Sequence, residues 1–183
     1  MHRPPFYGRP VTRYAAFLRG VNVGGVNLKM AEVAMALEDA GFTGVRTVLA
    51  TGNVLLDSRS GVDAVRKKAE KALRDTFGYD AWVLAYGLDT VRQISEAYPF
   101  EREVEGHHSY VTFVTDKGVL DELAELAKDA GPDEKIRRGN GVIYWQVPNK
   151  GTLDTTIGKT MGKKRYKSST TTRNLCTIEK VLK

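Results

Sequence analysis

Apolar and polar residues follow two periods along the chain, one typical of strands and one typical of helices. The apolar run at residues 14–18 predicts a buried strand. Over residues 29–40 apolar side chains recur at i, i+3, i+4 and i+7, which predicts an amphipathic helix that ends at Gly41. Two short apolar strands at 45–49 and 54–56, joined by a Thr-Gly-Asn turn, predict a hairpin.

A second helix and a fourth strand complete this first half. Residues 62–77 carry an apolar stripe with charged side chains mostly on the other face, and residues 81–86 form another short apolar strand. The resulting order, β-α-β-β-α-β, is that of a ferredoxin-like unit. Residues 13–86 are therefore predicted to form a first α+β unit.

The same order begins again in the second half of the chain. A predicted helix at 88–98 is followed by a strand at 110–114, a helix at 120–130 and a Gly-Asn-Gly hairpin at 135–147. Residues 87–183 are thus predicted as a second α+β unit. The fold class is α+β with two ferredoxin-like halves, and the sequence leaves open whether they pack as one body.

Composition narrows the class of protein. Hydrophobic residues make up 42% of the chain and charged residues 27%, values typical of globular proteins, and no apolar run approaches the length of a membrane span. Residues 1–12 contain proline and arginine without the apolar core of a signal peptide, so they are predicted to be a disordered tail of a cytoplasmic protein. The single cysteine, Cys176, excludes an intrachain disulfide and a thiolate metal cluster and is expected to be buried.

The positive charge is concentrated near the C-terminus. The net charge is +6, yet residues 150–183 hold nine basic and two acidic residues, whereas the rest of the chain holds 19 basic and 20 acidic residues. Basic side chains attract phosphates, and an exposed tyrosine can stack on a base of a single strand. The alternative interpretation is a solvated segment before a terminal helix. The candidate polyanion-binding residues are Lys159, Lys163, Lys164, Arg165, Tyr166 and Lys167.

A glycine-rich loop follows the first predicted strand. The loop lacks the Lys-Ser/Thr pair of a P-loop, and its glycines do not have dinucleotide-binding spacing, so neither ATP nor NAD is implied. Its backbone N–H groups, with Arg19 and Lys29 beside them, form a weaker candidate anion site. The alternative is structural: the glycines permit a tight turn, and Asn22 bonds the local backbone. The same alternative applies to Asn53 in the hairpin turn.

Three stretches resemble one bacterial family. They are RGVNVGG at 19–25 followed by Lys29-Met30, TGNV at 51–54, and TRN at 172–174, and they resemble the domain-of-unknown-function family 1697. The resemblance implies two ferredoxin-like halves and no assigned reaction. The chain departs from the family at Leu175, where Trp is common, and at Ala50, where Gln is frequent. A ligand that touches those two positions need not be the one that other members bind.

These patterns lead to two functional hypotheses. The first is non-catalytic binding of an anionic partner, either nucleic acid or a phosphorylated small molecule; the alternative is an enzyme acting on a small phosphorylated substrate at the glycine-rich loop. No catalytic constellation, cofactor motif or metal motif is recognised, and His107-His108 are expected in a solvated loop. The oligomeric state is not predicted. The candidate ligand-binding residues are Arg19, Asn22, Gly24, Gly25, Lys29, Asn53, Arg173 and Asn174.

Overall fold

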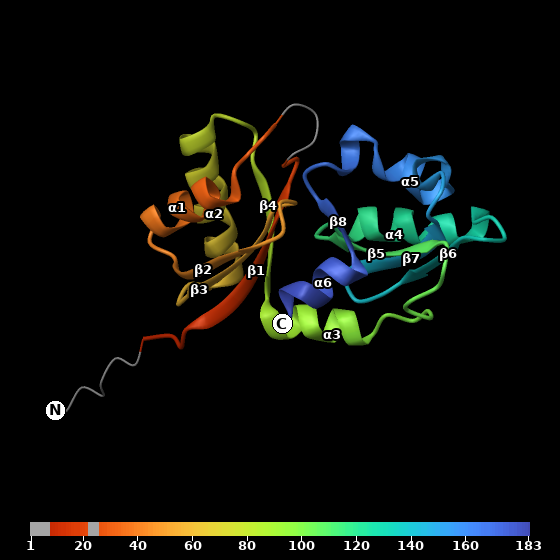
Figure 1. Cartoon of the computed structure of the whole chain (residues 1–183), viewed down its shortest axis with the longest axis horizontal. Helices are drawn as coiled ribbons and strands as arrows, with labels where there is room; N and C mark the ends of the chain where they lie inside the picture. Colours follow the sequence, from red (N-terminus) through yellow and green to blue (C-terminus); the bar gives the residue numbers. More distant parts are fainter. Residues whose placement is uncertain (1–7, 22–25) are drawn as a thin grey trace. The chain divides into compact units, whose positions relative to one another are not determined.

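The structure of the protein is a computed structural model that describes residues 8–21 and 26–183 (Figure 1). The chain divides into two compact units, Met1–Leu88 and Asp89–Lys183. Each unit contains a four-stranded antiparallel sheet with helices between its strands. The predicted α+β class with two ferredoxin-like halves is confirmed. In the described parts of the chain, no helix combines the length and apolarity needed to cross a membrane.

The first unit has the six predicted elements, with ends shifted by a few residues. Its sheet order is β2-β3-β1-β4, with all neighbouring strands antiparallel, as the β-α-β-β-α-β order of a ferredoxin-like unit requires. The elements are β1 (Thr12–Arg19), α1 (Met30–Asp39), β2 (Thr43–Val48), β3 (Asn53–Ser58), α2 (Val62–Phe77) and β4 (Trp82–Gly87).

The core of the first unit lies between its sheet and the two helices α1 and α2. Every second residue of β1 points to this side because side chains alternate along a strand, and the helices contribute residues spaced by three or four. The helical periodicity in the sequence therefore identified the buried faces. The buried residues at the centre include Tyr14, Ala16, Leu18, Val33, Leu37, Val65, Ala69 and Leu73.

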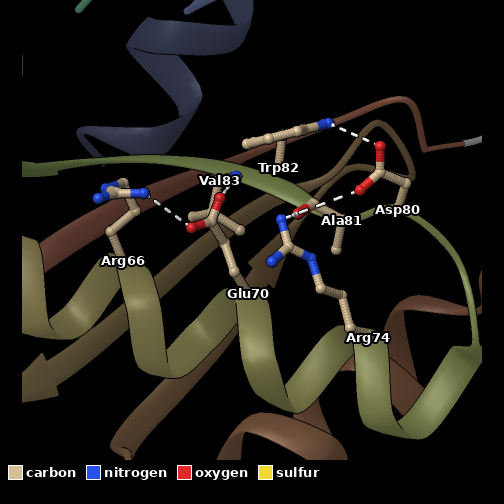
Figure 2. Close-up of polar contacts among 7 residues, drawn as sticks. All are labelled: Arg66, Glu70, Arg74, Asp80, Ala81, Trp82 and Val83. Atoms are coloured by element: carbon tan, nitrogen blue, oxygen red, sulfur yellow. Dashed lines mark hydrogen bonds and ion pairs between the residues drawn. The ribbon is translucent and has the colours of Figure 1, made fainter. Parts of the chain in front are cut away.

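Side chains of α2 bond the backbone along the outer edge of β4, the last strand of the first sheet (Figure 2). The Glu70 carboxylate accepts the N–H of Val83 at 3.1 Å, and Arg74 donates to the carbonyl oxygen of Ala81 at 2.8 Å. Glu70 is itself paired with Arg66 at 2.8 Å. Exposed edge strands tend to pair with other chains, and these contacts occupy one edge N–H of β4 and the carbonyl group just before the strand.

The second unit repeats the topology of the first, with the sheet order β6-β7-β5-β8. The last strand, β8, takes the place of β4, and the short helix α5 takes the place of α2 between the hairpin and that strand. The elements are α3 (Leu88–Glu96), β5 (His107–Val114), α4 (Lys117–Glu125), η1 (Leu126–Asp129), β6 (Lys135–Arg138), β7 (Val142–Pro148), η2 (Thr152–Asp154), α5 (Thr156–Met161), η3 (Lys164–Tyr166), β8 (Thr170–Asn174) and α6 (Leu175–Val181).

Three secondary-structure predictions differ from the structure. Leu49, predicted at the end of a strand, lies in the β2–β3 turn with a φ of 60°. His107 and His108, predicted in a loop, begin strand β5, where they pair with Pro148 and Val147. The strand β8 was not predicted because its sequence, TTTRN, has no apolar residue, although Thr is β-branched and suits a strand.

Candidate anion-binding sites

The basic segment, residues 159–167, is held against the rest of the second unit by two buried side chains, one just before it and one near its end. Ile157 of α5 and Tyr166 of η3 belong to the core formed with α4 and the sheet. Thr155 caps α5 by accepting the N–H of Gly158 at 3.1 Å. The segment therefore packs on the core of this unit through these buried residues, and its charged side chains are exposed on the surface.

Four lysines of the basic segment carry uncompensated charge. Lys159, Lys163, Lys164 and Lys167 are exposed, and none of them forms an ion pair with a carboxylate in the described parts of the chain. Exposed ammonium groups without acidic partners attract phosphates at little desolvation cost.

Arg165 and Tyr166 are engaged within the protein. Arg165 pairs with Glu122 of α4 at 2.6 Å and lies 5.2 Å from the centre of the Tyr166 ring. Tyr166 is 5% exposed, and its hydroxyl lies 3.4 Å from the other carboxylate oxygen of Glu122. Because the Tyr166 ring is part of the core, it is not accessible to a nucleic-acid base for stacking. The candidate contacts of this segment are therefore its basic side chains, which can bind phosphates.

The glycine-rich loop is only partly described, since Asn22, Gly24 and Gly25 lie outside the described residues. At the end of β1, the Leu18 N–H donates to the carbonyl oxygen of Gly52 at 2.8 Å, and Asn53 lies opposite Phe17 in the neighbouring strand. Arg19 and Asn53 are therefore at the same end of the first sheet, as the ferredoxin-like order predicts.

The Arg19 side chain at the end of β1 has an unsatisfied polar atom. Its Nε is buried and forms no hydrogen bond within the described residues. Burial lowers the pKa of the Arg19 guanidinium from its usual value. Lys29 is exposed at the N-terminal boundary of α1, where its side chain makes no capping hydrogen bond.

Asn53 has a structural role in the β2–β3 hairpin. Its side-chain amide donates to the carbonyl oxygen of Val48 at 3.0 Å and to the hydroxyl of Thr51 at 2.9 Å, and the residue is fully buried. These bonds hold a turn that contains two residues with positive φ, Leu49 at 60° and Gly52 at 83°. Asn53 thus stabilises the hairpin whether or not a ligand binds nearby.

The Thr-Arg-Asn stretch lies in the second unit, at the end of β8. Arg173 is 8% exposed and donates to the Thr171 hydroxyl at 2.7 Å and to the Thr172 carbonyl oxygen at 2.9 Å. Asn174 caps α6 by accepting the N–H of Cys176 at 2.9 Å. Both residues therefore have local partners that help to fix the strand and the helix after it.

Cys176 is exposed, so the expectation of a buried cysteine is wrong. It is the second residue of α6, two positions after the N-cap Asn174, and its side chain lies on the exposed side of the helix. Together with His107 and His108 it lines a small cavity of about 110 Å³, next to the ion pair of Arg102 and Glu179 at 2.7 Å. Within residues 8–21 and 26–183, no three His, Cys, Asp or Glu side chains are grouped as metal ligands.

Comparisons with known proteins identify a family and a fold. A family model described as "Protein of unknown function (DUF1697)" matches residues 11–144. The match ends before residues 172–174, which form one of the three stretches that carried the resemblance. No curated protein matches this chain.

One solved structure has a similar fold, that of the conserved bacterial protein SP0830 from Streptococcus pneumoniae. It is 23% identical to this chain, the alignment covers 94% of this chain and 97% of that one, and the TM-score is 0.76. At this level of identity the likeness supports the fold alone.

Proposed function

The chain belongs to the DUF1697 family, whose function is unknown, and for this member we propose non-catalytic binding of nucleic acid through the phosphate backbone. The basic segment of the second unit is the proposed contact surface. The observation that carries this proposal is the set of four exposed lysines, Lys159, Lys163, Lys164 and Lys167, that have no acidic partner within the described residues.

The physical basis is counterion release. A nucleic acid concentrates cations around its phosphates, and each lysine that contacts a phosphate releases part of this atmosphere. Residues 159–167 include five basic side chains and no acidic one, so the local field is positive even though Glu122 pairs with Arg165. The proposed affinity therefore falls as salt rises.

Weak sequence preference is also expected. Recognition of bases requires hydrogen bonds to base edges or aromatic stacking, and the one aromatic ring of the basic segment, Tyr166, is buried. Flexible lysines instead act as point charges toward phosphates. A partner would thus be bound for its charge, with little discrimination between sequences.

Fluorescence anisotropy of labelled single-stranded RNA and duplex DNA, at low and at physiological salt, tests this proposal. The K163Q/K164Q variant should bind RNA more weakly than the wild type. The slope of log affinity against log salt concentration should also be less steep by about 1.4, because each of the two lost phosphate contacts on a single strand contributes roughly 0.7. The matched control is K67Q/K117Q, which removes two exposed lysines elsewhere. Equal salt slopes for both variants, or no binding by the wild type at low salt, would contradict the proposal.

A second candidate is binding, or enzymatic turnover, of a small phosphorylated molecule at the Arg19 end of β1. The specific observation in its favour is the buried Arg19 Nε without a hydrogen-bond partner in the described chain, because a buried unsatisfied donor is costly and a ligand oxygen would satisfy it. Calorimetric titration with inorganic phosphate and a nucleoside monophosphate tests it, with R46Q as the control for R19Q. Phosphate binding that R19Q and R46Q reduce equally would exclude this site, and release of inorganic phosphate from the ester by the wild type but not by R19Q would favour an enzyme.

A further inference from the structure

A groove of about 270 Å³ lies in the second unit, between α3 and the turn that joins β6 to β7. Ile94 of α3 and Tyr144 of β7 are its buried apolar residues, and Gln93, Arg137 and Asn140 add polar groups at its rim. The groove is separate in sequence from both the basic segment and the glycine-rich loop. None of its residues was a candidate for binding on sequence grounds.

The floor of this groove is fixed by the protein itself. The Tyr144 hydroxyl donates to the carbonyl oxygen of Ile94 at 2.7 Å, and the Tyr98 ring meets the Tyr144 ring edge-on, with 5.7 Å between centroids. A Cβ at position 139 would lie 2.5 Å from Cε2 of Tyr144, so the close approach of this ring requires Gly139. The ring is held in place before any ligand arrives, which lowers the entropic cost of binding.

The charge of the groove is positive. The residues that line it include two arginines and no carboxylate. Arg138 is already paired with Asp121, whereas the Arg137 side chain forms neither an ion pair nor a hydrogen bond within the described part of the chain. The Arg137 guanidinium lies 5.5 Å from the centre of the Phe100 ring, a cation–π contact that leaves its N–H groups available to an acceptor.

We propose that this groove binds a small organic anion in which a carboxylate or phosphate is attached to a flat apolar body. The anionic group is bound by Arg137, the apolar body packs on Tyr144 and Ile94, and the side-chain amides of Gln93 and Asn140 bond polar atoms of the ligand. A buried apolar floor with a few polar groups around it is the usual composition of a small-molecule site, and the volume is near the lower limit of such sites, about 300 Å³.

Titration of the full-length ¹⁵N-labelled protein, followed by heteronuclear NMR, tests this inference with three probes. Benzoate and phenyl phosphate carry the two anionic groups on the same ring, and benzamide is the neutral control. We expect saturable shifts of the Gln93 and Asn140 side-chain amides and of the Gly139 N–H with both anions and not with benzamide. The anion that binds with the higher affinity then shows whether the site prefers a carboxylate or a phosphate. Equal shifts with benzamide, or shifts confined to other regions, would overturn the proposal.

Variants separate this site from general charge effects. R137Q should weaken binding of the better anion roughly fivefold, as expected for loss of an exposed charged partner. R92Q, which removes an exposed arginine of α3 outside the groove, should bind like the wild type, and A97F should block the groove. K163Q/K164Q should leave benzoate binding unchanged, which distinguishes this site from the basic segment. If R137Q and R92Q lose the same amount of affinity, or A97F binds as well as the wild type, the groove is not the site.

Discussion

The Glu70 carboxylate bonds the backbone N–H of Val83, with 3.1 Å between Oε2 and the nitrogen, and thereby joins α2 to the edge of the first sheet (Figure 2). Glu70 is 5% exposed, and its other oxygen accepts from Arg66 at 2.8 Å. A buried carboxylate is tolerated when its charge is paired and its oxygens accept hydrogen bonds, and both conditions hold here. The same contact occupies an N–H that an edge strand would otherwise offer to another chain.

Replacing Glu70 with Gln should lower the free energy of unfolding by about 1–3 kcal/mol, because a buried charge-assisted contact is lost while the shape is kept. Urea denaturation measures this change. The matched control is Asp75→Asn on the same helix, where the Lys71–Asp75 pair is 78% and 62% exposed and should matter by less than about 0.5 kcal/mol. Equal destabilisation by the two variants would show that the Val83 contact contributes nothing.

Gly158 is predicted to be intolerant of a side chain. A Cβ at this position would overlap the carbonyl oxygen of Thr152 and crowd the Thr155 hydroxyl that caps α5. Gly158→Ala should therefore destabilise the protein by about 1–3 kcal/mol. In Gly162→Ala, a few residues further on, the nearest atom would be the Lys159 carbonyl oxygen at 3.7 Å, an ordinary contact. Thermal denaturation of both variants checks the difference, and a Gly162→Ala protein that is no more stable than Gly158→Ala would contradict it.

The fold was predictable where burial followed a regular period. Residues 62–77 carry a helical stripe, and α2 has those bounds. Prediction failed where polar side chains form buried structure, as in β8. Its Thr170 and Thr171 are buried, and the Thr172 hydroxyl lies 2.8 Å from that of Thr112, which in turn accepts the indole N–H of Trp145. Such pairing depends on a partner 60 residues away and leaves no local pattern.

The candidate sites, like the fold, were predictable from the sequence only where a local pattern marks them. The density of lysines between residues 159 and 167 was visible in the sequence, but the burial of Tyr166 was not, because it depends on packing against α4. The groove beside Tyr144 lies between α3 and the β6–β7 turn, which is more than 40 residues further along the chain. Arg137 belongs to the short strand Lys-Ile-Arg-Arg, whose sequence does not indicate a binding site. Only the folded chain brings these residues together.

Glu122 is predicted to limit the affinity of the basic segment for polyanions. Its carboxylate pairs with Arg165 at 2.6 Å and lies next to the Tyr166 hydroxyl. Glu122→Gln would remove one negative charge and release Arg165, so binding of single-stranded RNA should strengthen and the salt slope should steepen by up to about 0.7. Anisotropy titrations at several salt concentrations measure both. The control is Glu125→Gln, which removes a carboxylate from the same helix as Glu122 and leaves Lys128 without its partner. An equal gain in RNA affinity from this variant would show that net charge alone is responsible.

The buried hydroxyl of Tyr144 predicts a loss of stability at alkaline pH. Burial raises the pKa of Tyr144, an effect partly offset by the positive charge of Arg102. The folded state therefore holds this proton more tightly than the unfolded state, whose tyrosines ionise near pH 10. The resulting stabilisation is fully present below about pH 10 and is lost as the pH rises through the folded pKa.

Tyr144→Phe lacks the ionisable group and the bond to Ile94, so it should be less stable than the wild type at neutral pH, by about 1 kcal/mol. The gap should narrow above about pH 10, and urea denaturation from about pH 8 to about pH 11 measures it. A gap that stays constant over this range would show that ionisation of Tyr144 is not coupled to unfolding.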